Sequence, residues 1–126
     1  MRHRLELAAK ALAIERVATG GLAAIVPGRV LGAIAAPGSD TEAVRYVARF
    51  LGIRQVVLGV MLWQSSADRA WLRRMATLNA LTEALDAAAT LVALVQRRGG
   101  ARPSAAVVGA ALSASAAFVA LRAAAT

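Results

Sequence analysis

Residues 79–90 read NALTEALDAAAT, and they place four polar side chains within a run of alanine and leucine. Asn79, Glu83, Asp86 and Thr90 are separated by steps of four, three and four residues. At about 100° per residue, this spacing puts all four on one narrow face of an α-helix. A single polar stripe on an otherwise apolar helix predicts that the stripe faces the interior of a helical bundle rather than lipid.

The composition of the whole chain indicates the same class of protein. Hydrophobic residues make up 59% of the 126 positions and charged residues 17%, and the mean hydropathy is +0.59. Soluble domains usually contain ~45–50% apolar and ~25% charged residues. The length allows about four membrane crossings of ~20 residues with short loops. We therefore predict an all-α fold, an integral-membrane four-helix bundle that forms a single domain over residues 1–126.

Helix breakers and capping pairs set the predicted helix boundaries. The breakers are Pro27-Gly28, Gly99-Gly100 and Pro103, and the capping pairs are Ser39 with Glu42 and Ser65 with Asp68. The four predicted helices cover about residues 5–26, 40–63, 66–98 and 103–125. The apolar segment 29–37 is too short to cross a bilayer, so we expect it to lie at the interface or to fold back.

Three of the four predicted spans carry charged residues. Only residues 103–121, an uncharged run of 19 residues, meet the strict hydropathy criterion for a span. The other spans contain the acidic residues Glu15, Glu83 and Asp86 and the basic residues Arg16, Arg49 and Arg54. Because an unpaired charge in lipid is costly, these three anions and three cations predict a neutralised bundle interior.

Glu83 and Asp86 are the candidate catalytic residues. Two neighbouring carboxylates in a low-dielectric pocket can hold different protonation states and act as general acid and general base. The alternative is an ion-pair brace with Arg49 and Arg54, which the need to neutralise buried carboxylates favours. Arg54 itself, near the middle of its span, would either orient an anionic group of a substrate or neutralise one of the two acidic residues.

Glu15 and Asn79 complete the candidate polar set. Asn79 shares the helix face of Glu83 and Asp86. Glu15 would either relay protons with those two carboxylates, as carboxylate chains do in transporters, or pair locally with Arg16. A local pair is the more common arrangement for adjacent residues of opposite charge.

Small and aromatic residues predict where the helices meet each other and the membrane surface. Gly52 and Gly59 lie on one side of the second predicted helix, where they allow another backbone to come close. Trp63 and Trp71 flank the following turn, a position typical of the aromatic belt at a membrane interface.

The charge and the residue types present exclude several classes of function. The net charge is +8, but the basic residues lie in small groups at the ends of apolar segments rather than in a stripe among aromatics. This pattern favours lipid headgroups over nucleic acid as the partner. The chain has no cysteine and a single histidine, His3, so we expect neither a metal site nor a bound cofactor.

Basic residues near the span ends predict the orientation. One side would carry Arg2, Arg4, Lys10, Arg69, Arg73, Arg74 and Arg122, and the other Arg29, Arg45, Arg97, Arg98 and Arg102. The larger group is expected inside, which predicts a multi-pass protein of the cell membrane with both termini cytoplasmic. Charged residues interrupt the apolar region that a signal peptide needs, so we expect the first helix to be retained.

Three stretches of the chain are similar to a known family. They are Pro27 after a glycine-containing first helix, the run Arg49-Phe50-Leu51-Gly52-Ile53-Arg54 leading into Val57-Leu58-Gly59, and Asp86-Ala87. In these residues the chain resembles DoxX-like proteins, small bacterial membrane proteins that include families of unknown function. The resemblance extends over most of the chain and implies four transmembrane helices. It implies no activity.

The leading functional hypothesis is a small integral-membrane bundle whose buried charge network shapes a polar pocket or a contact between subunits, with a homo-oligomer as one possible form. One alternative is a membrane-embedded enzyme that uses Glu83 or Asp86 in isomerisation, cyclisation or epoxide opening of a lipophilic metabolite. Another is a small oligomeric transporter. A soluble helical bundle is a further alternative, because charges interrupt three of the spans.

Overall fold

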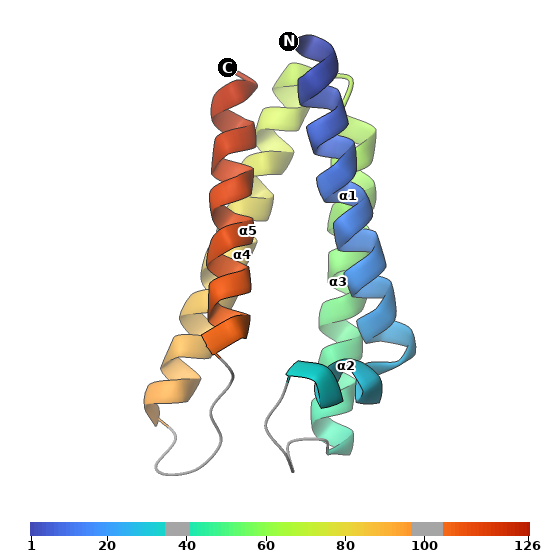
Figure 1. Cartoon of the computed structure of the whole chain (residues 1–126), viewed down its shortest axis with the longest axis vertical. Helices are drawn as coiled ribbons and strands as arrows, with labels where there is room; N and C mark the ends of the chain where they lie inside the picture. Colours follow the sequence, from blue (N-terminus) through green and yellow to red (C-terminus); the bar gives the residue numbers. More distant parts are fainter. Residues whose placement is uncertain (35–40, 97–104) are drawn as a thin grey trace.

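The computed structural model describes residues 1–34, 41–96 and 105–126, with side chains at 1–33, 41–89 and 114–126. Within these ranges the regular secondary structure is α1 (Arg2–Ile25), α2 (Pro27–Ile34), α3 (Glu42–Ser65), α4 (Arg69–Gln96) and α5 (Ala105–Ala124). The four long helices run alternately up and down, and both termini lie at the same end (Figure 1). The prediction of an all-α fold is confirmed.

The long helices form two pairs. α1 packs along α3, and α4 packs along α5, whereas the contacts between one pair and the other are much sparser (Figure 1). A buried apolar cluster joins the pairs in the half of the molecule that holds the termini. It consists of Ala9, Ala13, Leu62, Leu72, Met75, Ala76, Phe118, Leu121 and Ala125, so all four long helices contribute to it.

Glycines bring α1 and α3 into backbone contact. A Cβ atom added to Gly52 would lie 2.5 Å from the carbonyl oxygen of Gly20, and one added to Gly59 would lie 2.9 Å from the carbonyl oxygen of Ala13. No side chain larger than hydrogen fits at these distances. The prediction that Gly52 and Gly59 allow a close backbone approach is therefore confirmed, and α1 is the helix that approaches.

The end of the first helix lies within one residue of the predicted boundary, and the chain bends sharply there. α1 ends at Ile25 and α2 begins at Pro27, because proline cannot continue the hydrogen-bond ladder of the preceding helix. The two helix axes differ by 109°. α2 covers the first part of the segment that was expected at the interface or folded back, and the part beyond Ile34 lies outside the described residues.

The predicted limits of α3 are corrected at both ends. The helix begins at Glu42, because the Thr41 side-chain oxygen accepts a hydrogen bond from the Val44 amide at 3.3 Å. Ser39, the predicted cap, lies outside the described residues. At the other end α3 extends to Ser65, two residues beyond the predicted limit.

Asp68, rather than Ser65, caps α4. One Asp68 carboxylate oxygen accepts hydrogen bonds from the amides of Ala70 and Trp71 at 2.8 and 3.1 Å. The Ser65 hydroxyl instead donates to the Leu62 carbonyl at 2.9 Å within α3. α4 therefore begins at Arg69, three residues later than predicted.

One helix within the described residues, α3, is long and apolar enough to cross a membrane. α1 and α2 meet the same test only if they are counted together across their bend. The uncharged run 103–121 begins outside the described residues, and side chains are described from Ala114 onward. Four membrane crossings therefore stay a prediction.

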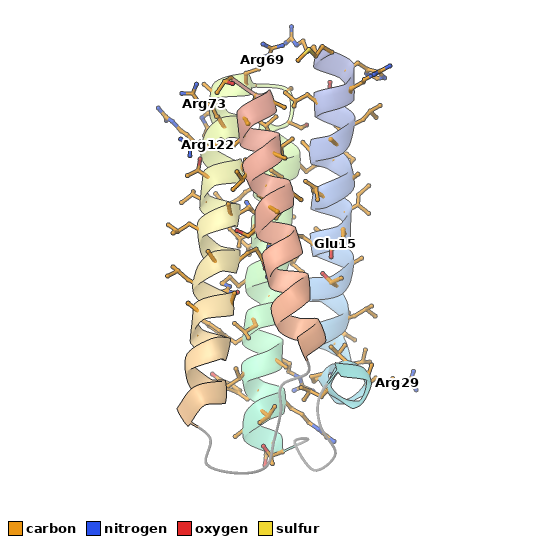
Figure 2. All side chains as sticks on the ribbon, turned by 60° about the vertical axis from the view of Figure 1, so that its left-hand side comes forward. Glu15, Arg29, Arg69, Arg73 and Arg122 are labelled. Carbon is orange, nitrogen blue, oxygen red and sulfur yellow. The ribbon has the colours of Figure 1, made fainter. Side chains whose placement is uncertain are left out.

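The surface is apolar along its length and basic at its ends. Exposed large apolar residues include Ile14, Val17 and Leu22 on α1, Phe50, Ile53, Val57 and Val60 on α3, and Leu78, Leu81 and Leu85 on α4. Arg69, Arg73 and Arg122 lie at the end that holds the termini, Arg29 lies near the other end, and Glu15 lies between them (Figure 2).

Candidate functional site

Arg16 of α1 is the centre of a polar network inside the bundle. The side chain is 2% exposed, and its guanidinium forms a salt bridge with Glu83 of α4, with Nη2 and Oε1 2.5 Å apart. A second nitrogen of the same group donates to the Oε1 atom of Gln55 of α3. Gln55 in turn donates from Nε2 to Glu83 Oε1 at 3.2 Å. Three side chains from three helices thus form a closed triangle of hydrogen bonds.

The fourth long helix reaches Arg16 through an aromatic ring. The guanidinium carbon of Arg16 lies 4.6 Å from the centre of the Phe118 ring of α5. Phe118 is 1% exposed. A planar cation over an aromatic face is attracted by the ring quadrupole, and more strongly where water is excluded. One arginine therefore contacts side chains of α3, α4 and α5 at once.

A second ion pair connects α3 and α4. Arg54 Nη2 donates to the Asp86 carboxylate, and each of these side chains is 34% exposed. Asp86 lies one helical turn beyond Glu83, so this pair neighbours the buried triangle on the same face of α4. Both ion pairs join the α1–α3 pair of helices to the α4–α5 pair.

Asn79 lies one helical turn before Glu83 on α4, but its hydrogen bond is to its own helix and not to either ion pair. Its side chain is fully buried, and Nδ2 donates to the Met75 carbonyl of the same helix at 2.8 Å. Its Oδ1 atom has no hydrogen-bond partner among the described residues. The inward stripe predicted for α4 is thus observed for Asn79, Glu83 and Asp86, and the Thr90 side chain lies outside the described residues.

The structure changes one predicted ion pair and retains another. The sequence predicts Arg49 and Arg54 as the partners of Glu83 and Asp86. Glu83 instead pairs with Arg16, whereas the observed pair of Arg54 with Asp86 is one of those predicted. Arg49 is exposed.

Glu15 is also exposed. Adjacent helical residues point about 100° apart, so Glu15 and Arg16 cannot both face the bundle interior. Of the predicted three anions and three cations, two of each form ion pairs between helices, and Glu15 and Arg49 lie on the surface. The four paired residues have no net charge.

Gln55 is absent from the residues predicted for the interior, and Arg16 is predicted there as a buried charge but not as a site residue, although the sequence contains a signal for both. Ala9, Ala13, Arg16 and Gly20 are spaced by four, three and four residues, and Gly52, Gln55, Gly59 and Leu62 by three, four and three. Each set occupies one helix face, and that face is mostly small residues. A long polar side chain within a stripe of small residues is placed where helices come closest, and it must find its partner there.

The geometry of the network is that of a buried ion-pair cluster. Glu83 Oε1 accepts from both Arg16 and Gln55, whereas Arg16 Nε is buried without a hydrogen-bond partner among the described residues. Among the described residues no group of three or more His, Asp or Glu side chains is arranged to hold a metal ion.

Comparison of the chain with protein families, characterised proteins and solved structures gives no significant match. The resemblance to DoxX-like membrane proteins therefore stays a prediction from the sequence.

Proposed function

We propose that this chain is a small integral-membrane helical-bundle protein in which the buried charge network braces two helical pairs against each other. The observation that carries the proposal is the exposure of α3. Only 17% of its most apolar 18-residue window is buried within the bundle. A core helix of a soluble protein would be mostly buried, and a signal sequence would lie near the N-terminus. Lipid is the solvent that suits a long, exposed, apolar helix.

Aromatic residues at the two ends of α3 support the same proposal. Tyr46 and Phe50 are exposed near its start, and Trp63 is exposed near its end, beside the exposed Trp71 of α4. Tyr46 and Trp63 are about 26 Å apart at ~1.5 Å per residue, close to the ~30 Å thickness of the hydrocarbon core. Tyrosine and tryptophan are enriched at the two surfaces of this layer.

The bracing role follows from where the ion pairs lie. Direct packing between the two helical pairs is sparse outside the apolar cluster, and the Arg16–Glu83 and Arg54–Asp86 pairs bridge them. In a bilayer the association of helices gains little from the hydrophobic effect, so hydrogen bonds and close packing contribute more of the energy. The salt bridge that Glu83 forms with the buried Arg16 supports this bracing role.

The basic residues support an orientation with both termini in the cytoplasm. Arg69, Arg73 and Arg122 gather at the end that holds the termini (Figure 2), and Arg2 and Arg4 belong to the same end of α1. Short basic segments are retained on the cytoplasmic side.

Alkaline carbonate extraction of the expressed protein tests the membrane proposal, and a reporter at each terminus tests the orientation in the same cells. We expect the protein to remain in the membrane pellet, with both reporters inside. Recovery in the soluble fraction would contradict the proposal.

Carboxamide variants then distinguish a structural role of the two carboxylates from a catalytic one. Glu83→Gln and Asp86→Asn, with Arg54→Met, should all unfold more easily in detergent, because each leaves a charged partner unmatched. If the two carboxamide variants fold as the parent does but abolish conversion of a lipophilic substrate, the site is catalytic and the bracing role is wrong.

A further inference from the structure

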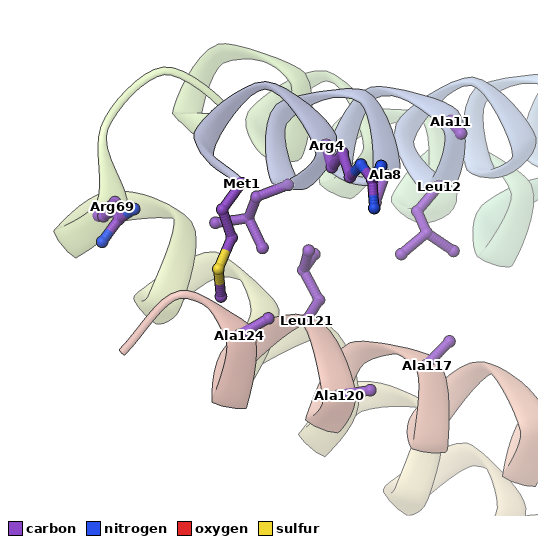
Figure 3. Close-up of a pocket in the computed structure, with 11 residues that line it drawn as sticks. Met1, Arg4, Ala8, Ala11, Leu12, Arg69, Ala117, Ala120, Leu121 and Ala124 are labelled. Carbon is purple, nitrogen blue, oxygen red and sulfur yellow. The ribbon is translucent and has the colours of Figure 1, made fainter.

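A groove of about 620 Å³ opens between the first turns of α1 and the last turns of α5 (Figure 3). α1 and α5 touch sparsely. The groove walls are largely methyl groups of alanine, among them Ala8 and Ala11 on α1 and Ala117 and Ala120 on α5. Small side chains on both facing helices leave room that larger ones would fill. The volume is within the ~300–1,000 Å³ range of ligand sites.

The length of the groove matches one leaflet of a bilayer. Its lining along α1 extends from Met1, the N-cap residue, to Leu12, a distance of about 16 Å at ~1.5 Å per residue. One leaflet contributes about half of the ~30 Å hydrocarbon core. An acyl chain that enters the groove from the end of the bundle would therefore reach the middle of the bilayer near Leu12.

Two arginines line this apolar groove. Arg4 of α1 and Arg69 of α4 both line it, and both are exposed. Figure 3 shows Arg69 at the end that holds Met1, and Arg4 partway along the groove.

The acidic residues nearest to them in sequence have other partners. Glu6 pairs with Lys10, and Asp68 accepts the two amides that begin α4. Guanidinium groups beside an apolar groove suit an anionic phosphate that carries a hydrocarbon chain.

We propose that this groove binds one acyl chain of an anionic phospholipid, with the lipid phosphate held by Arg4 and Arg69. The proposal rests on the membrane location proposed above. A second copy of this chain is a less suitable occupant. Copies inserted in the same direction would bring the same basic end together, with Arg73 and Arg122 beside Arg69 (Figure 2), and like charges in contact oppose association.

Lipid binding to the purified full chain tests the proposal. Native mass spectrometry from detergent would measure retention of phosphatidylglycerol against phosphatidylcholine with the same acyl chains. We expect the parent to prefer phosphatidylglycerol and the double variant Arg4→Ala with Arg69→Ala to lose about tenfold or more of that preference, because direct charge-assisted hydrogen bonds from the guanidinium groups to the phosphate are removed. The matched control, Arg73→Ala with Arg122→Ala, removes the same charge outside the groove lining and should retain the preference.

A second variant tests the apolar part of the site. Ala120 lines the groove and is exposed, so Ala120→Phe should fold as the parent does, fill the groove, and reduce retention of both lipids. Glycerol phosphate, which lacks an acyl chain, should not compete.

Several outcomes would overturn the proposal. An equal loss in the two double-arginine variants would show that only overall charge matters. Dimer formation that Ala120→Phe abolishes, with the lipid preference intact, would assign the groove to a second copy. If the protein stays in the membrane pellet but shows no lipid preference, only the proposal of lipid binding in the groove is wrong. If carbonate extraction releases the protein into the soluble fraction, the membrane proposal is wrong as well.

Discussion

Helix contacts within the α1–α3 pair and contacts between this pair and α4–α5 are stabilised by different interactions. Within the α1–α3 pair, Gly20, Gly52 and Gly59 allow the two backbones to touch. Between this pair and α4–α5, packing is sparse and the Arg16–Glu83 and Arg54–Asp86 pairs make the connection. The comparison teaches that one bundle can combine close van der Waals packing with bridging charges, and that the two contacts should respond differently to mutation.

The largest effect is expected at the buried charge. Arg16→Met leaves Glu83 buried with only Gln55 as a hydrogen-bond donor, which should cost about 3–5 kcal/mol of unfolding free energy. Denaturant titration of the protein in detergent would measure the loss. The neighbouring exposed residue provides the control, since Glu15→Gln should change the unfolding free energy little. Adding Glu83→Gln to Arg16→Met should recover part of the loss, and no recovery would show that the two residues are not coupled.

An intermediate effect is expected in the glycine contact. Gly52→Ala would place a methyl group 2.5 Å from the Gly20 carbonyl oxygen, so α1 and α3 must separate at a cost of about 1–3 kcal/mol. Gly21 has no atom within 4 Å of an added Cβ, and Gly21→Ala should instead stabilise by about 0.5–1 kcal/mol through helix propensity. Equal effects of the two alanines would contradict the close contact between α1 and α3.

The smallest effect is expected at the partly exposed ion pair. Arg54 and Asp86 are each 34% exposed, so solvent screening should reduce the loss in Arg54→Met to about 1 kcal/mol or less. The same titration, repeated at high salt, should show a smaller difference between Arg54→Met and the parent. A loss as large as that of Arg16→Met would place this pair in a drier environment than its exposure indicates.

Local sequence signals predicted the helices well because the interactions that start and stop a helix are local. Pro27 ends α1, and Thr41 and Asp68 are polar caps close to the predicted ones. The inward direction of Glu83 follows from helical periodicity alone. The sequence also contained the small-residue stripe around Arg16, but it showed two charges side by side, Glu15 and Arg16, without indicating which faces inward.

The amino-acid sequence by itself determined an all-helical chain, its approximate helix boundaries, and a single α4 face that carries Asn79, Glu83 and Asp86. Only the tertiary structure decided that Glu83 pairs with Arg16 and that Arg54 pairs with Asp86. The physical reason is that helical periodicity shows which residues share a face of one helix. It does not show which other helix packs against that face, or how far the two helices are shifted along their axes. The Gly20–Gly52 contact sets the level of α1 against α3 and brings Arg16 beside Gln55. The packing of α4 against this pair of helices then brings Glu83 to both side chains.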